Sequence, residues 1–137
     1  MWWLYALLSA FFAALTAIFA KMGIKGIDSD LATAIRTLVI LFIAWGIVVY
    51  KGIGAETTHL TRQNWIFLLL SGAATGLSWI FYFRALQMGK VSQVAPVDKT
   101  SVAIAILLSA VILKETLTWK ALLGAAMIIG GTIVLIL

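Results

Sequence analysis

Pro96, Asp98 and Lys99 stand together ahead of a run without charges, residues 102–113. An aspartate can accept and release a proton, and a lysine can bind an anionic group. A proline inside a helix removes one backbone donor, and a break there would expose the N-terminus of a half-helix that starts near Val97. The positive end of that half-helix would also favour an anion. The three residues are therefore candidates for a binding or proton-coupling site.

The composition indicates a membrane protein. Of 137 residues, 64% are hydrophobic and 11% are charged, whereas soluble domains average about 45–50% apolar and about 25% charged residues. The ten Lys and Arg residues are dispersed singly between apolar runs and form no basic patch for nucleic acid. No Cys and one His leave no thiolate metal site. We expect the lipid bilayer as a partner, and no nucleic acid, metal or cofactor.

Five apolar segments follow one another, and each is long enough to cross a bilayer as a helix. The runs are uninterrupted and lack the alternation of barrel strands. We therefore predict an all-α integral membrane bundle of five transmembrane helices in a single domain, residues 1–137. Ser29 or Asp30, Asn64 and Thr118 are expected to cap the second, third and fifth helices. The predicted helices are residues 2–20, 31–50, 65–83, 91–113 and 119–137.

The length of the fourth segment places Asp98 and Lys99 inside the membrane. Residues 100–113 make about 21 Å of helix, which is too short for a hydrocarbon core of about 30 Å. If the span begins at Val91, Asp98 lies about 10 Å inside, where a carboxylate cannot snorkel well. Neighbouring side chains on a helix point about 100° apart, so Arg36 or a second subunit is the expected partner. The alternative is a proline in the first turn of a helix that follows an interfacial segment.

Arg36 and Trp79 are the other unusual residues within predicted spans. Arg36 lies about 9 Å inside the second helix if that helix starts at Asp30, and snorkelling to the surface is favoured over substrate contact. Trp79 is interior to its helix, where it could stack on a substrate or fill volume in the bundle. Arg84 and Glu115 are expected to face headgroups or water. The candidate substrate or coupling residues are Asp98, Lys99, Pro96 and Arg36.

Polar and small residues recur at helical spacing in several segments, which places them on common faces. The faces could line a shared cavity, or the hydroxyls could bond to their own helix carbonyls while small residues only pack. The candidate cavity-lining residues are Ser9, Thr16, Ser71, Thr75, Ser78, Trp79, Tyr82, Ser101 and Ser109. The candidate helix-packing residues are Gly72, Gly76, Gly124 and Gly131.

The basic residues of the short loops do not favour one orientation, since four lie on each side of the predicted membrane. An odd number of spans places the two termini on opposite sides, so a second copy fused in tandem would be inverted. We expect the single unit to insert both ways and to pair with itself as an antiparallel homodimer. The two sets are Lys51, Arg62, Lys114 and Lys120, and Lys21, Lys25, Arg84 and Lys90.

From Ala85 onward, the segment "ALQMGKVSQVAPVDKTSVAIAILLSAVILKETLTWKALLGAAMIIGG" has an ordered set of motifs. They are an Ala-Leu-x-x-Gly junction, a proline in the next helix, an apolar run that ends in Leu-x-Glu, then Leu-Thr-Trp and spaced glycines. In this order the chain resembles the EamA-type unit of the drug/metabolite transporter superfamily, over essentially its whole length. One departure is Lys114, where the family usually has glycine before the glutamate that corresponds to Glu115.

The resemblance implies half of a ten-helix inverted-repeat transporter that moves a small metabolite or drug by alternating access. Because the chain is one unit, it also implies a dimer or a partner subunit. The small multidrug resistance proteins are a related family, but the first helix lacks the membrane-embedded glutamate on which they rely. A non-transporting membrane subunit of a larger complex and a lipid-linked sugar flippase are the alternative functions for such a bundle. No catalytic constellation indicates an enzyme, and we expect a bacterial or archaeal cytoplasmic (inner) membrane.

Overall fold

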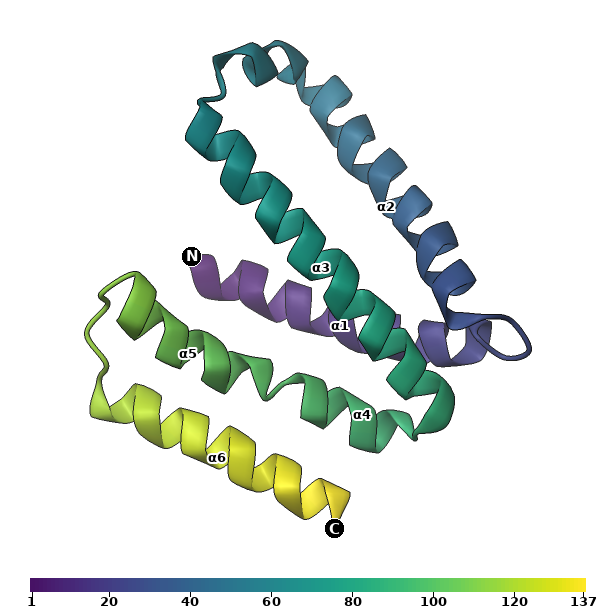
Figure 1. The fold of residues 1–137 in the computed structure, drawn as a ribbon, viewed down its shortest axis with the longest axis vertical. Coiled ribbons are helices and arrows are strands. Elements are labelled where there is room, and N and C mark those ends of the chain that lie inside the picture. The colour runs from purple at the N-terminus through teal and green to yellow at the C-terminus, as the bar shows by residue number, and fades with distance from the viewer. The chain divides into compact units, whose positions relative to one another are not determined.

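The computed structural model describes residues 1–137 and consists of helices and their connections, without strands (Figure 1). Five stretches are long and apolar enough to cross a membrane, and α4 and α5 together make the fourth of them. The predicted all-α class with five membrane-spanning helices is therefore confirmed. The elements are α1 (Trp2–Gly23), α2 (Ser29–Lys51), the 3₁₀ helix η1 (Gly54–His59), α3 (Arg62–Met88), α4 (Val91–Asp98), α5 (Ser101–Ile112) and α6 (Trp119–Ile136).

The helices form two compact units. We call Met22–Gln87 the hairpin unit, because it contains α2, η1 and most of α3. We call Met1–Lys21 with Met88–Leu137 the terminal unit, because it contains most of α1 together with α4, α5 and α6.

Local capping determines where the two long helices of the hairpin unit begin and end. Asp28 caps α2, since its Oδ1 accepts from the backbone N–H groups of Asp30 at 2.8 Å and Leu31 at 3.2 Å. The prediction of Ser29 or Asp30 was wrong by one or two positions. At the other end Gly52 adopts φ 68°, which glycine tolerates and which ends the helix.

The starts of α3 and α6 are capped by threonines. The Thr61 hydroxyl oxygen accepts from the backbone N–H of Asn64 at 3.2 Å, so Thr61 occupies the capping position predicted for Asn64. The Thr118 hydroxyl oxygen accepts from the backbone N–H of Ala121 at 3.2 Å, which confirms the predicted cap of the last helix.

In the terminal unit, α6 packs along both α4 and α5 (Figure 1). Small buried residues, Ala103 of α5 and Ala125 of α6, belong to these helices. Small side chains let helix backbones approach closely, which is how helices associate in lipid. The end of α1 is joined to the connection between α3 and α4, because Lys21 Nζ donates to the Gly89 carbonyl at 2.8 Å.

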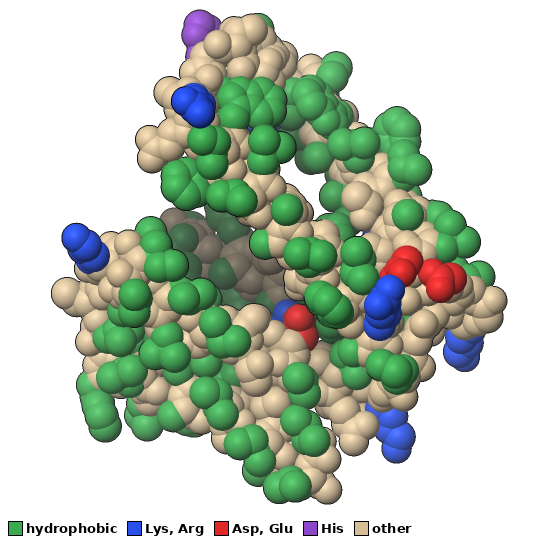
Figure 2. All heavy atoms as spheres, in the orientation of Figure 1, with side chains coloured by type: hydrophobic (Ala, Val, Ile, Leu, Met, Phe, Trp, Pro, Cys, Tyr) green, Lys and Arg blue, Asp and Glu red, His purple; other side chains and the backbone are tan.

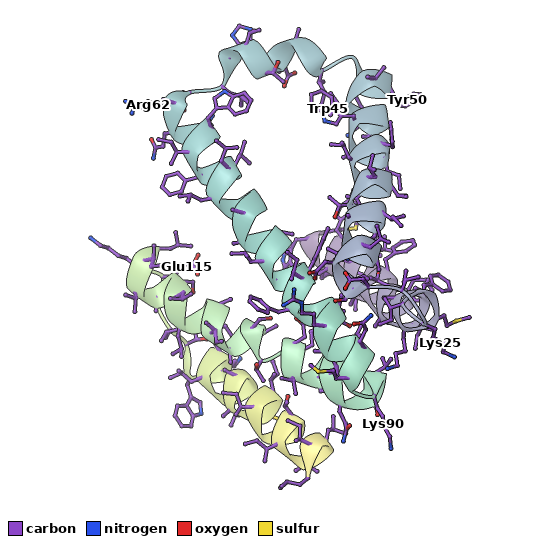
Figure 3. All side chains as sticks on the ribbon, turned by 45° about the vertical axis from the view of Figure 1, so that its right-hand side comes forward. Lys25, Trp45, Tyr50, Arg62, Lys90 and Glu115 are labelled. Atoms are coloured by element: carbon purple, nitrogen blue, oxygen red, sulfur yellow. The ribbon has the colours of Figure 1, made fainter.

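Apolar side chains are distributed over all the visible helices, and charged side chains are few (Figure 2). Exposed apolar side chains are favourable on a surface that faces acyl chains. The aromatic residues Trp45 and Tyr50 lie toward the η1 end of α2 (Figure 3). Charged residues gather at helix ends and connections, as labelled for Lys25, Arg62, Lys90 and Glu115 in Figure 3.

The connection from α5 to α6 turns through Lys114, which has φ 56°. This left-handed conformation favours glycine, because a Cβ is crowded against the backbone there. Lys114 is the position at which the resembling family usually has glycine. The chain therefore has a lysine at a position whose backbone conformation suits glycine better.

We expect Lys114→Gly to raise the free energy of unfolding by up to about 1 kcal/mol, since the relief of left-handed strain exceeds the extra entropy of the unfolded glycine. Lys114→Ala removes the charge and retains the Cβ, so it should give no such gain. Unfolding in mixed micelles with increasing dodecyl sulfate measures both variants. An equal gain in the alanine variant would mean that charge, not backbone strain, is responsible.

Candidate functional site

The fourth span changes its hydrogen bonding at Lys99 and Thr100. The Thr100 N–H bonds the Val97 carbonyl at 3.0 Å, three residues back, in place of the usual four. Pro96 lies inside α4, and α5 begins at Ser101. The predicted half-helix start near Val97 was therefore wrong by about one turn.

The carbonyls of Pro96 and Val97, just before the break, accept hydrogen bonds from donors outside the regular helical pattern. These donors explain why the helix breaks at this position. The Thr100 hydroxyl donates to the Val97 carbonyl at 2.7 Å. The Pro96 carbonyl accepts from the Lys99 N–H at 3.1 Å and from the Thr132 hydroxyl at 3.2 Å. These bonds replace the regular pattern one turn after the proline and stabilise a tightened turn there.

Asp98 and Lys99 form an ion pair at the break, with Lys99 Nζ 3.2 Å from Asp98 Oδ2. The expectation that Lys99 would not be the partner was wrong, and a contact of Asp98 with Arg36 or with a second subunit stays a prediction. A lysine side chain is long enough to fold back across the angle between neighbouring positions. The side chains are 58% exposed for Lys99 and 32% exposed for Asp98. A cation and a proton acceptor are thus accessible at one bend of the helix.

Thr132 is the supporting residue that the sequence prediction missed. It is buried in α6, and its hydroxyl lies 2.8 Å from the Ile128 carbonyl of its own helix as well as near Pro96. Its position between apolar residues in the last span was an available signal, because an intramembrane hydroxyl needs an acceptor. Thr132 links α6 to the backbone just before the break.

The predicted hydroxyl stripes are divided between the two units. Thr75 donates to the Ser71 carbonyl at 2.9 Å and Ser109 to the Ile106 carbonyl at 3.0 Å, so both bond within their own helices. Their convergence on one cavity stays a prediction. The candidates in the terminal unit are Ser9, Thr16, Ser101 and Ser109, and those in the hairpin unit are Ser71, Thr75, Ser78, Trp79 and Tyr82.

The predicted packing glycines have open space beside them in the structure. Apart from adjacent residues and the backbone of the same helix, no atom lies within 4 Å of the position that a Cβ would take at Gly72, Gly76, Gly124 or Gly131. A role in close helix contact stays a prediction for all four.

Arg36 is held against aromatic rings in the hairpin unit. Its Cζ lies 4.2 Å from the ring centroid of Trp79 and 5.2 Å from that of Phe83. Tyr82 is also close enough to interact with it electrostatically. The guanidinium therefore turns toward α3, in place of the expected snorkelling to the membrane surface.

These rings compensate only part of the free energy of placing an arginine in a membrane. Insertion at a helix centre costs about 2.5–3.5 kcal/mol or more, whereas a cation–π contact contributes about 0.5–2 kcal/mol. Arg36 forms no ion pair with a carboxylate of the hairpin unit, in which Asp30 pairs with Arg84. Within this unit the charge of Arg36 is therefore compensated by aromatic rings alone.

Asp30 and Arg84 form a two-pronged ion pair that joins the ends of α2 and α3. Arg84 Nη2 lies 2.6 Å from Asp30 Oδ2, and Nε lies 3.2 Å from Oδ1. Gln87 Nε2 donates to the Ile27 carbonyl at 2.7 Å at the same end. Arg84 was expected to face headgroups or water, and its partner was missed. Opposite charges at one end of two antiparallel spans were the available signal.

A groove of about 460 Å³ lies between α2 and α3. Its wall is mainly apolar, and the hydroxyls of Thr33 and Thr37 bond to carbonyls of their own helix at 2.8 Å. The lining residues are Asp30, Thr33, Ala34, Thr37, Leu38, Leu41, Gly76 and Ile80.

We expect Thr132→Val to lower the free energy of unfolding by about 0.5–1.5 kcal/mol, because it removes the donor to the Pro96 carbonyl and preserves volume. Thr75→Val is the matched control, since that hydroxyl bonds only within its helix, and it should change stability by less than about 0.5 kcal/mol. Dodecyl sulfate unfolding compares the two. Equal losses would contradict a special role for the Thr132 contact.

Comparison with known proteins identifies the chain's relatives. Residues 1–137 match the EamA-like transporter family. A protein of Sinorhizobium sp., described as an uncharacterized transporter in the cobO 3' region, is 46% identical over 134 residues, which make up 98% of this chain and 95% of that protein. No solved structure matches the chain. On the match over its whole length, with five helices able to cross a membrane, the chain belongs to the EamA-like transporter family.

Proposed function

We propose that the chain transports a small metabolite or drug by alternating access, as an antiparallel homodimer in a bacterial or archaeal cytoplasmic (inner) membrane. Membership of a transporter family and five apolar helices support an integral membrane transporter. The strongest support for this function is the fourth span, which is broken between α4 and α5 and has the Asp98–Lys99 ion pair at the break. Irregular backbone at membrane depth is tolerated only where protein buries it or where it lines a cavity.

The break lies at a depth that suits a substrate site. Lys99 follows Val91 by about 12 Å in a span of about 33 Å, which places it about a third of the way along the span, inside the hydrocarbon region. Transporters of inverted-repeat architecture bind substrates and coupling ions near the midplane, at discontinuous helices. In our proposal Lys99 contacts the substrate, Asp98 exchanges the coupling proton and Pro96 helps to shape the bend.

The homodimer follows from the size of one unit. An EamA unit is half of a ten-helix arrangement. The Sinorhizobium relative is of similar length, since 134 aligned residues are 95% of it. Two inverted copies would reproduce the inverted repeat that tandem units provide in one chain. The even distribution of Lys and Arg between the loops supports insertion in both orientations.

Loss of contents from proteoliposomes tests transport while the substrate is still unidentified. Vesicles with the purified chain are loaded with a small-molecule extract of bacterial cells, and the retained compounds are measured by mass spectrometry. We expect selective loss of one group of compounds relative to protein-free vesicles. No loss with the chain alone, but loss after a second membrane protein is added, would instead support a non-transporting subunit.

The same assay tests the role of Asp98. With an imposed pH gradient, the wild type should accumulate the identified substrate against its gradient, and Asp98→Asn should abolish this accumulation, because an amide cannot carry the proton. Exchange without a gradient should persist in the variant. Asp28→Asn, which changes a carboxylate in the α1–α2 connection, is the control. Normal pH-driven accumulation in Asp98→Asn would contradict the assignment.

Reporters fused to the C-terminus test the antiparallel pairing. Alkaline phosphatase is active outside the cytoplasm and green fluorescent protein inside it, and we expect both fusions to give signal in native membranes. Adding two lysines to one loop should shift the ratio toward one orientation. A single exclusive orientation of the unmodified chain would rule out the antiparallel homodimer.

A further inference from the structure

Arg36 is the one guanidinium in the hairpin unit that lies within a span, carries no carboxylate partner and contacts aromatic rings. Arg84, by contrast, is paired with Asp30, and Arg62 lies at the first position of α3. Within the hairpin unit, the contacts of the Arg36 guanidinium are with the rings of Trp79 and Phe83 and an electrostatic interaction with Tyr82.

The guanidinium stays inside the tied end of the hairpin. The Asp30–Arg84 pair brings those two residues to the same level. Counted from that level, Trp79 lies about 7.5 Å further in along α3, and the Cα of Arg36 about 9 Å further in along α2. Because the Arg36 Cζ lies closer to the Trp79 ring than to the Phe83 ring, the charge remains below the level of the ion pair.

We propose that Arg36, seated on Trp79 and Phe83, binds a carboxylate group of the transported substrate. The inference rests on the proposed transport function and assigns the substrate class, a small organic acid or zwitterion. The aromatic rings contact the guanidinium, and no carboxylate of the hairpin unit pairs with its N–H edges, whose two parallel donors match a carboxylate. The surrounding rings would contact an apolar part of the same molecule.

A phosphate of a lipid headgroup offers the same oxyanion chemistry. The position of the charge argues for a soluble substrate, because a headgroup phosphate lies at the membrane surface, whereas the guanidinium lies beside Trp79, further from the end of the hairpin than the Asp30–Arg84 pair. The half-buried Trp79 would report on either occupant, since its indole lies directly beside the charge.

Titration with benzoate into the purified chain in dodecyl maltoside, a detergent without charge, tests the site. Benzamide has the same shape without the charge and is the matched ligand control. We expect a saturable change in tryptophan fluorescence with benzoate and a Kd for benzamide at least tenfold weaker. Arg36→Gln should weaken benzoate at least tenfold, whereas Arg62→Gln, the same change at the start of α3, should leave the Kd unchanged. Equal benzoate affinity in wild type and Arg36→Gln would overturn the proposal, as would equal binding of benzoate and benzamide.

A charge-preserving variant keeps the test decisive if Arg36→Gln does not fold. Arg36→Lys retains the cation but loses the paired donors, so benzoate should bind about threefold to tenfold more weakly. An unchanged Kd in this variant would also overturn the proposal.

Lipid composition distinguishes the two sources of the oxyanion. The titration is repeated in nanodiscs of phosphatidylcholine alone and of phosphatidylcholine with an equal part of phosphatidylglycerol. An unchanged Kd supports a substrate carboxylate, and competition by phosphatidylglycerol that disappears in Arg36→Gln would assign the site to a lipid. Because this is equilibrium binding, benzoate binding without vesicle efflux would refute transport and leave the subsite intact.

Discussion

Every backbone carbonyl and N–H group within a membrane must find its partner in the protein, because lipid offers none. The fourth span meets this requirement at its bend through side chains. Thr100 supplies a hydroxyl to the Val97 carbonyl, and Thr132 of α6 supplies one to the Pro96 carbonyl. The polar bend is therefore stabilised from within its own span and by one buried threonine of another helix. These hydrogen bonds stabilise the bend at which the Asp98–Lys99 ion pair lies.

Two ion pairs neutralise charges on the helices, and Arg36 has no such carboxylate partner within its own unit. Asp98 with Lys99, and Asp30 with Arg84, each bring opposite charges together within a unit. Arg36 has aromatic rings in place of a carboxylate. Rings orient a guanidinium and leave its donor edges available, whereas a carboxylate would occupy them. The different surroundings of Arg36 and Arg84 thus give chemically different arginines on two neighbouring helices.

Hydrophobic run length predicted the helical class and the number of spans, since the need for about 20 apolar residues in lipid is a local property. The cap by Thr118 was predictable because capping also depends on residues that are close in the sequence. The Asp30–Arg84 pair and the Thr132–Pro96 contact depend on the register between helices that are distant in the sequence, which periodicity does not contain. The position of the bend was mispredicted because Pro96 shows only which backbone N–H is missing. The hydroxyl of Thr100, which bonds the Val97 carbonyl, contributes to where the regular hydrogen bonding stops.

The hairpin unit is joined at one end by side chains, Asp30 with Arg84 and Gln87 with the Ile27 carbonyl, and at the other end by the η1 connection. In an antiparallel pair, each membrane face would present the tied end of one copy beside the η1 connection of the other. The two faces would then be chemically identical. A protein of that symmetry has no built-in inward or outward preference, so gradients alone would decide the direction of net movement.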